Sequence, residues 1–325
     1  PNTVYSYHVI RYRSNNIDFK YKKYICNNYY VQNYFSSRAT GTVRQTLSRN
    51  DFKTLPIVLP PDPQQQRIAD YLDKKCAEID DVIKAKEKTN ELLKEERQSI
   101  IYEAVTKGLD KNAPLKDSGI EWIGQIPERW ELIKLKYLFS VINGATPKSG
   151  NAEYWDGEIM WITPADYNTE DKFILYSKRY ITKEGVNSCG TSIVPEGSII
   201  ISNRAPIGLI SLAGKKLCTN QGCKSLVKNV ELSSLFYYYY LSVMESPLNM
   251  LGKGTTFLEL SSEELKEFRL LFPSISEQQQ IAEYLDKKCA EIDDVIKANN
   301  TLIEKLREYK KSIIYEAVTG KKEVC

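Results

Sequence analysis

Apolar residues recur in alternating steps of four and three along residues 65–106, and again along residues 278–319. Such spacing is the a/d seam of a coiled coil. It predicts two helices of on the order of 60 Å each, at roughly 1.5 Å per residue. The seam positions expected to meet a partner helix are Leu72, Ile79, Ile83, Leu93 and Ile100 in the first stretch, and Leu285, Ile292, Ile296, Leu306 and Ile313 in the second.

The two stretches are copies of one another. Each contains YLDKKCAEIDDVIKA and ends SIIYEAVT, and every match lies 213 positions downstream of its partner. A period this long excludes a solenoid and indicates one large duplicated module. The offset continues ahead of the helices, so residues 1–60 correspond to residues 214–273. The counterpart of about the first hundred residues of the later globular segment has no place in this chain, which begins with Pro1 and suggests a fragment.

Polar residues mark where the predicted helices begin. Asp62 offers an N-cap with Pro63 at the first helical position, and Ser276 with Gln279 offers a capping box for the second helix.

Glycine and asparagine add detail to the helical pattern. Gly108 and Gly320 stand where the helices should end. Lys86, Asn90 and Asn299 make the middle of the seam polar, which lowers stability but fixes register and partner choice. One interpretation is a helical hairpin with frayed polar positions. The other, which near-identical seams favour, is that the helices pair with each other and hold two globular domains at a set distance.

Composition narrows the possible sites. The 325 residues include seven cysteines without a CxxC pair and a single histidine, His8, so we expect no metal site. There is no signal peptide and no 18-residue apolar run, which predicts a reducing cytoplasm. Residues 1–64 hold nine Lys/Arg against three Asp/Glu, whereas residues 108–277 hold 18 against 20. A basic first segment is consistent with nucleic-acid binding, and any polyanion site in the later segment must be a local patch.

The globular segments read as mixed α and β. We predict strands over residues 5–11, 159–163, 173–176, 198–202 and 209–212, and helices over residues 20–35 and 233–244. Residues 111–118 read as a polar linker, and Trp122 and Trp130 as core anchors. The fold class is therefore α+β: globular α/β domains joined by two long antiparallel coiled-coil helices.

Catalytic motifs are missing from the sequence. No P-loop, GxGxxG or GxSxG stands in the required context, and one histidine leaves little room for a His-based triad. We therefore expect no catalytic residues and a protein that is not an enzyme. Five polar loops stand out instead, at residues 143–148, 163–166, 203–208, 219–222 and 252–256, and all but the second contain glycine. Asn, Gln and Arg read base edges, and Lys, Ser and Thr take phosphates.

With these motifs in this order, the chain resembles the specificity subunit of type I restriction–modification systems. The resemblance rests on IPxxW at residues 126–130, GxTP at 144–147, WITPAD at 161–166, RAPIG at 204–208, TNQG at 219–222 and the QQxIA exit at 278–282. It covers nearly the whole chain, but only the end of a first recognition domain is present. This departure leaves open whether one molecule reads two half-sites or borrows a recognition domain by dimerisation.

The resemblance implies a domain plan and a set of partners. The plan is the end of a first target-recognition domain (1–60), a coiled-coil helix (61–108), a linker (109–118), a second target-recognition domain (119–273) and a second helix (274–325). The implied role is recognition of a bipartite DNA target in a bacterial or archaeal cytoplasm, with methyltransferase and restriction subunits as partners and a homodimer as a further possibility. S-adenosylmethionine, ATP and Mg would serve those subunits, with no cofactor on this chain.

The expected DNA contacts lie in the polar loops. They are Asn143, Thr146, Lys148, Asn203, Arg204, Asn220, Gln221, Lys253, Thr255 and Thr256, with Arg38, Thr42 and Arg44 in the first segment. Burial in a hydrogen-bonded loop is the rival interpretation for Arg204, Asn220 and Gln221. A coiled-coil scaffold that binds protein without reading DNA is the alternative function, supported by the balanced charge of residues 108–277. A nuclease or methyltransferase is disfavoured by the missing motifs.

Overall fold

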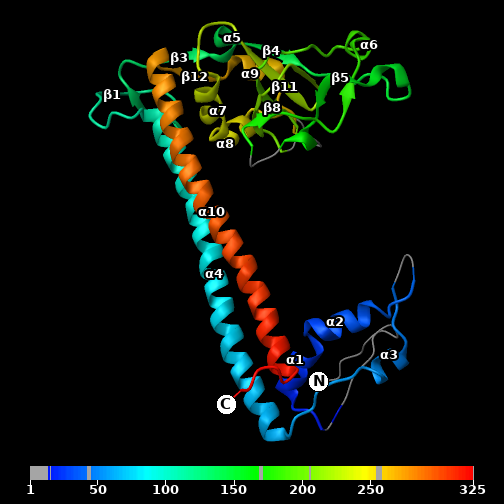
Figure 1. Cartoon of the computed structure of the whole chain (residues 1–325). Coiled ribbons are helices and arrows are strands. Elements are labelled where there is room, and N and C mark those ends of the chain that lie inside the picture. Colours follow the sequence, from blue (N-terminus) through cyan, green and yellow to red (C-terminus); the bar gives the residue numbers. More distant parts are fainter. Residues whose placement is uncertain are drawn as a thin grey trace. The chain divides into compact units, whose positions relative to one another are not determined.

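The computed structural model describes residues 14, 16–41, 45–167, 171–204, 206–253 and 258–324 (Figure 1). The chain divides into two compact units: unit 1 comprises residues 1–93 and 293–325, and unit 2 comprises residues 94–292. Each unit combines globular segments with part of the two longest helices, α4 (Asp62–Lys107) and α10 (Ile275–Val318). Among the described residues, no helix has the length and apolar character needed to cross a membrane.

The α4 and α10 portions of unit 1 pair antiparallel, which confirms the expected pairing of the two helices. Asn299 Nδ2 donates to Asn90 Oδ1 at 2.8 Å, and Asn90 Nδ2 donates to Asn300 Oδ1 at 2.9 Å. Lys310 Nζ lies 2.6 Å from the Asp80 carboxylate. The buried asparagines satisfy each other and can do so only in this register, because a shifted helix would leave both amides unpaired in an apolar seam.

The predicted seam faces inward along both helices. In unit 2, Ile101, Ala104 and Val105 of α4 share one core with Leu285 and Cys289 of α10. All ten predicted seam residues are buried or half-buried: Leu72, Ile79, Ile83, Leu93, Ile100, Leu285, Ile292, Ile296, Leu306 and Ile313. Lys86 is also half-buried.

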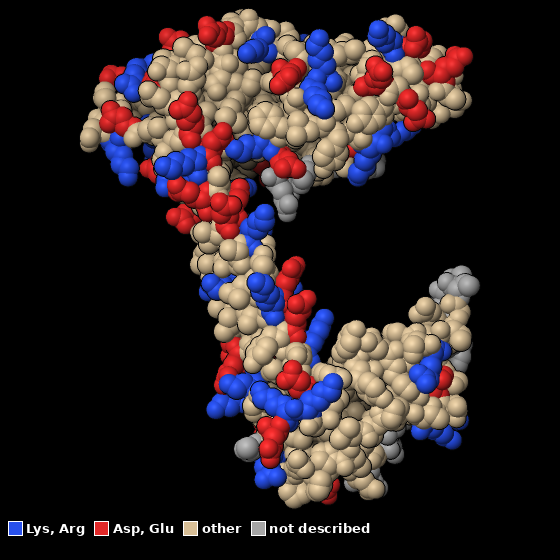
Figure 2. Space-filling view, in the orientation of Figure 1, with Lys and Arg blue, Asp and Glu red and all other residues tan. Residues whose placement is uncertain are grey.

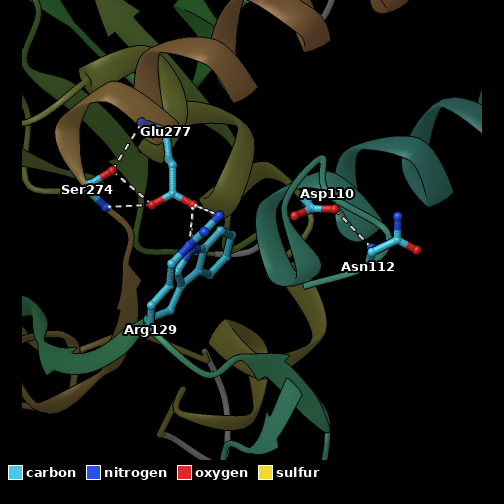
Figure 3. A network of polar contacts seen from close by, with 6 residues as sticks. Asp110, Asn112, Arg129, Ser274 and Glu277 are labelled. Atoms are coloured by element: carbon cyan, nitrogen blue, oxygen red, sulfur yellow. Dashed lines mark hydrogen bonds and ion pairs between the residues drawn. The ribbon is translucent and has the colours of Figure 1, made fainter. Parts of the chain in front are cut away.

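Helix α4 begins one residue earlier than the sequence suggested, and helix α10 begins two residues earlier. Helix α4 starts at Asp62, so Asp62 is not the N-cap. In α10 the capping box is Ser274 with Glu277 rather than Ser276 with Gln279: Ser274 N and Oγ donate to the Glu277 carboxylate, and Glu277 N donates back to Ser274 Oγ (Figure 3). Ser274 and Ser276 could each cap the helix, but only Ser274 has an acidic residue, Glu277, three positions later.

The predicted ends of the helices are confirmed. Gly108 and Gly320 both adopt positive φ, 75° and 74°. Gly108 N donates to Ala104 C=O at 3.1 Å, which ends α4 in the left-handed conformation that glycine takes without strain.

Among its described residues, unit 1 holds three short helices beside the long ones. They are α1 (Phe19–Cys26), α2 (Tyr29–Ser36) and α3 (Arg49–Lys53). The single helix expected over residues 20–35 is therefore wrong: Asn28 interrupts it, because its side chain accepts from Val31 N and caps α2. The strand expected over residues 5–11 lies outside the described residues.

Unit 2 is built on short strands. A five-stranded sheet has the order β4-β11-β8-β9-β6, a three-stranded sheet the order β10-β5-β7, and two pairs, β1-β2 and β12-β3, complete the set. Their bounds are β1 Leu115–Asp117, β2 Gln125–Pro127, β3 Glu131–Lys134, β4 Phe139–Asn143, β5 Trp155–Ile162, β6 Phe173–Ile174, β7 Tyr180–Ile181, β8 Ile199–Ser202, β9 Ile210–Ala213, β10 Leu217–Thr219, β11 Cys223–Lys228 and β12 Arg269–Phe272.

The four strands predicted in this unit coincide with β5, β6, β8 and β9. The remaining strands were missed, and residues 111–118 are not simply a linker, since they contain β1. The helix predicted over residues 233–244 is α7 (Ser234–Ser242), with Ser233 as its N-cap. The other helices are α5 (Leu135–Leu138), α6 (Lys183–Asn187), α8 (Glu245–Met250) and α9 (Ser262–Glu267), with 3-10 turns η1 (Ala152–Tyr154) and η2 (Pro164–Asp166).

The core of unit 2 joins helix α7 to the long helices. Trp130 is fully buried, Trp122 packs beside the core, and three of the consecutive tyrosines, Tyr237, Tyr239 and Tyr240, are buried in it. These tyrosines therefore pack in the core of unit 2.

The duplication is visible in the geometry of the two units. Gln65 Nε2 donates to Pro60 C=O at 2.8 Å, and its Oε1 accepts from Asp18 N at 2.9 Å, at the start of α1. Gln278, 213 positions later, donates to Pro273 C=O at 2.9 Å and accepts from Ser233 N at 2.9 Å, at the start of α7. Each glutamine is buried and joins the first turn of a long helix to a short one, so α1 and α7 are structural equivalents.

Candidate nucleic-acid interface

The polar loops singled out in the sequence gather at one edge of the sheets of unit 2, here called the loop edge. Strands β4, β5, β8 and β10 end there and β11 begins there. Ala145 N donates to Thr219 C=O at 3.0 Å, Asn203 N donates to Gly222 C=O at 3.0 Å, and Leu260 N donates to Asn203 C=O at 2.9 Å. Loops that are up to 74 positions apart in sequence are thus held together by backbone hydrogen bonds.

Gly144 makes this convergence possible. A Cβ at this position would lie 2.0 Å from Asn220 O and 2.4 Å from Thr219 O. Only glycine lets the two loops approach so closely, because both opposing atoms are backbone.

Thr146 and Gln221 face each other across this approach. Thr146 Oγ1 donates to Gln221 Oε1 at 2.5 Å, and both side chains are exposed. The neighbouring Asn220 turns inward, since its Oδ1 accepts from Gly222 N at 2.9 Å. The Gln221 NH₂ group donates to no described residue, whereas the Asn220 side-chain carbonyl shapes the turn.

Asn203, Arg204 and Glu259 form a second group at the loop edge. Asn203 is only 1% exposed; its Nδ2 donates to Glu259 Oε1 at 3.1 Å, and its Oδ1 has no hydrogen-bond partner among the described residues. Arg204 Nε donates to Glu259 Oε2 at 3.3 Å while about half of its side chain stays exposed. The carboxylate thus orients the guanidinium, whose side chain stays partly exposed.

Sequence reasoning missed Lys224, which braces the loop edge from β11. It is 6% exposed, and its Nζ donates to Asn143 Oδ1 at 2.9 Å and to Ser262 Oγ at 3.0 Å. Burial lowers the pKa of this ammonium, and the nearby Glu259 and Glu263 act in the opposite direction. The only signal in the sequence was a lysine inside an apolar strand, which alone does not distinguish a brace from an exposed edge residue.

The remaining predicted contacts differ in setting. Lys148 and Lys253 are exposed, and Lys253 Nζ pairs with Glu264. Arg38 belongs to unit 1, where its guanidinium lies 3.8 Å from the centre of the Tyr34 ring. Thr42, Arg44, Thr255 and Thr256 lie outside the described residues.

Charge on unit 2 is mixed rather than segregated. Figure 2 shows Lys and Arg interspersed with Asp and Glu over its visible face. Two of the exposed donors of the loop edge, Arg204 and Lys253, each pair with a carboxylate, Glu259 and Glu264 respectively.

Comparison with known proteins points in one direction. The family described as "Type I restriction modification DNA specificity domain" matches residues 1–94 and 127–308. The type I restriction enzyme MjaIX specificity subunit of Methanocaldococcus jannaschii is 38% identical over 190 residues, which are 57% of this chain and 43% of that protein. The putative MjaX specificity subunit of the same organism is 28% identical over 319 residues, 96% of this chain and 70% of that protein.

Solved structures show the same fold. A structure described as "Structural basis underlying complex assembly and conformational transition of the type I R-M system" matches 96% of this chain and 73% of its own, with a TM-score of 0.78 and 20% identity. The HsdS subunit of Thermoanaerobacter tengcongensis matches 93% of this chain and 70% of its own, with a TM-score of 0.55 and 19% identity. The chain spans less than half the length of the MjaIX subunit.

Proposed function

Because the chain belongs to the family of type I restriction modification DNA specificity domains, we propose that unit 2 is a sequence-specific reader of double-stranded DNA. One observation supports this role above the others: the loop edge collects exposed amide, guanidinium and ammonium donors from separate loops on a rigid sheet. A side chain can discriminate bases only if its position is fixed, and here sheet backbone and buried braces fix it.

The polar side chains of the loop edge have three proposed roles: contacts to bases, contacts to phosphates, and support of the contacting side chains. Gln221 and Arg204 carry the paired N–H groups that suit adenine and guanine edges in the major groove. Lys148 and Lys253 supply point charges for phosphates, which position the domain without specifying sequence. Asn143, Asn203 and Asn220 act as braces of this constellation, since their side-chain amides are bonded within the protein.

The wider assembly follows the family. The chain would direct methyltransferase and restriction subunits to a bipartite site, with S-adenosylmethionine, ATP and Mg handled by those subunits. The paired helices α4 and α10 are the natural docking surface for such partners, since their exposed faces are long, regular and free of the globular loops.

The test is selection of random DNA duplexes by the purified chain, followed by affinity measurements at several salt concentrations. We expect one enriched half-site and a linear fall of log affinity with log salt, because phosphate contacts release counterions. Arg204→Ala should weaken binding by about tenfold, from roughly 1–3 kcal/mol for a bidentate base contact, and relax selectivity at one base pair.

Lys228→Ala is the matched control. It removes a positive charge from the opposite end of β11 and should leave selectivity unchanged. Binding that ignores both sequence and salt would instead favour a protein-interaction scaffold.

A further inference from the structure

A small aromatic core in the three-stranded sheet of unit 2 lies under one exposed cation. Trp155 and Trp161 of β5 are both buried and meet edge to face, with their ring centroids 5.2 Å apart. Arg179 Cζ lies 3.6 Å from the centre of the Trp155 ring and 5.5 Å from that of Trp161, yet Arg179 is exposed. A guanidinium stacked on an indole keeps its N–H groups in its own plane, so the ring orients these donors without using them.

Arg179 belongs to the loop edge. Strand β5 ends at that edge, and β7 runs antiparallel to β5 with Tyr180 opposite Met160, so the residue directly before β7 lies at the same edge. Trp161 N donates to Arg179 C=O at 3.1 Å, and Arg179 N donates to the Ser177 hydroxyl at 3.2 Å. Both backbone groups of Arg179 are thus bonded, which fixes the point from which its side chain starts.

A bulge in β5 brings the tryptophan under the arginine. Trp155 and Ile159 both pair with Ile181, so the three residues between them leave the ladder. Asp156 has a φ of 59°, and a Cβ at the following Gly157 would lie 2.5 Å from Ile181 O. Asp and Gly are residues that tolerate such a conformation and such a close approach. A bulge re-aims the side chain beside it, and here it directs the indole of residue 155 to the arginine.

The two indoles also hold the loop at residues 143–148, which carries three of the predicted DNA contacts. Trp155 Nε1 donates to Lys148 C=O at 3.2 Å, and Trp161 Nε1 donates to Ala145 C=O at 2.9 Å. The same two rings therefore fix the arginine and this loop relative to each other.

The two arginines of the loop edge are held by different means. Glu259 pairs with Arg204, and its negative charge offsets part of the charge that it orients. Arg179 is held by a neutral aromatic surface, which orients the guanidinium without offsetting its charge. Arg179 is therefore both fixed in plane and available to an acceptor.

We propose that Arg179 contacts a base of the DNA target, with its guanidinium donating to the O6 and N7 acceptors of a guanine in the major groove. This assignment rests on the proposed function of unit 2 as a reader of double-stranded DNA. Paired N–H groups in a fixed plane match the two guanine acceptors, whereas a phosphate contact positions the protein without carrying sequence information. The stack also reduces the side-chain freedom that an unsupported arginine loses on binding.

The first experiment compares the purified full chain with Arg179→Lys in selection from random DNA duplexes. This variant keeps the charge and loses the planar pair of donors. We expect it to lose the preference for guanine at one base pair, distinct from the pair that Arg204→Ala affects, and to bind the selected site about tenfold more weakly. Lys183→Ala, just beyond the opposite end of β7, is the matched control and should leave selectivity unchanged.

A modified base separates a base contact from a phosphate contact. 7-Deazaguanine lacks the N7 acceptor, so its use at the selected position should weaken binding of the wild type severalfold and binding of Arg179→Ala hardly at all. Equal losses in the two proteins would overturn the assignment. A loss of affinity in Arg179→Lys that is the same for every sequence would also overturn it, in favour of a phosphate contact.

A pair of variants tests the part of the tryptophan. Trp155→Phe and Trp155→Leu both lose the hydrogen bond to Lys148 C=O, but only the first keeps an aromatic face. With both proteins held below their denaturation midpoints, the Leu variant should relax the same base pair as Arg179→Lys, and the Phe variant should retain it. Equal selectivity in the two variants would contradict a role for the stack.

The wild-type selection distinguishes the two levels of the proposal. A chain that selects no sequence would overturn the proposed function and this assignment together. A selected half-site that Arg179→Lys leaves unchanged would overturn the assignment alone and leave the proposed function in place.

Discussion

Units 1 and 2 start from the same helical sequence and differ in how their globular parts are completed. Both place a buried glutamine between a proline carbonyl and a short helix. Both also tie that short helix to a long one through a tyrosine: Tyr24 Oη to Asp73 at 2.6 Å, and Tyr239 Oη to Asp286 at 2.5 Å. The difference begins at the last strand: β12 pairs with β3 in unit 2, whereas the corresponding residues 57–59 form no ladder among the described residues of unit 1. Contacts made by the repeat itself are therefore reproduced locally, whereas strand pairing depends on residues from elsewhere in the chain.

The largest effect should come from removing Trp130, the buried tryptophan directly ahead of β3 in unit 2. Trp130→Ala leaves a cavity beneath β3 and should cost about 3–5 kcal/mol of stability. Amide exchange should show the loss in unit 2 and not in unit 1. Tyr137→Ala is the control, since that ring is 62% exposed and should contribute little. An equal loss of protection in both units would contradict the division into two units.

The shared glutamines should matter equally in both units. Gln65→Leu and Gln278→Leu each orphan one buried N–H and one carbonyl, at roughly 2–3 kcal/mol apiece. Exchange should accelerate at Asp18 N–H in the first variant and at Ser233 N–H in the second. Gln279→Leu, at an exposed neighbouring position, should leave both amides unchanged. A loss of stability in only one of the two variants would contradict the structural equivalence of α1 and α7.

The asparagine pair tests the helix pairing within unit 1. Asn90→Leu leaves the buried Asn299 amide without its partner and should cost about 1–2 kcal/mol. The double variant Asn90→Leu/Asn299→Leu should recover most of this, because two apolar residues then meet. A double-mutant cycle in denaturant measures the coupling, and a coupling energy near zero would mean that the amides act independently.

The smallest effect should come from replacing Glu277 with the residue at the corresponding position of unit 1, Gln64. Burial raises the pKa of Glu277, but hydrogen bonds from Ser274, Trp130 and Arg129 outweigh it and hold the pKa below its ordinary value of 4.5. The stabilisation is therefore fully present above that value and is lost as pH falls through the lower, folded-state pKa. Glu277→Gln should cost about 1 kcal/mol at pH 7.

The pH dependence separates charge from packing in this variant. Denaturation midpoints of wild type and Glu277→Gln should converge as pH falls below 4.5. A constant difference down to strongly acidic pH would mean that the carboxylate acts through shape and not through its charge.

The helices were predictable because their signal is long and local. A seam repeated over more than 40 residues leaves one helical solution, and glycines mark the ends. Strands were found only where a continuous apolar run was long enough, as at β8, where all four residues are buried. Strands such as β3 and β11 mix charged residues with apolar ones, so they carry no continuous apolar run.

The residues of the loop edge could be picked out from the sequence, but the contacts between them could not. Gly144 and Gln221 were visible as loop residues, but their approach depends on a pairing between β4 and β11 that spans about 80 positions. For the same reason nothing in the sequence separated Asn203, which is buried, from Arg204, which is half exposed. Glu259, which holds both, gave no signal at all.

The pairing of β3 with β12 has a consequence for how this protein can change. Lys134 and Arg269 are register partners, so the chain leaves the frame of unit 2 and returns to it at adjacent points. Everything from Leu135 to Phe268, including the loop edge, is thus inserted between two neighbouring strands. A domain whose ends meet in this way can be exchanged for another without moving its frame. Residues 135–268 could therefore be replaced by another segment in a single exchange, while the β3–β12 frame of unit 2 stays unchanged.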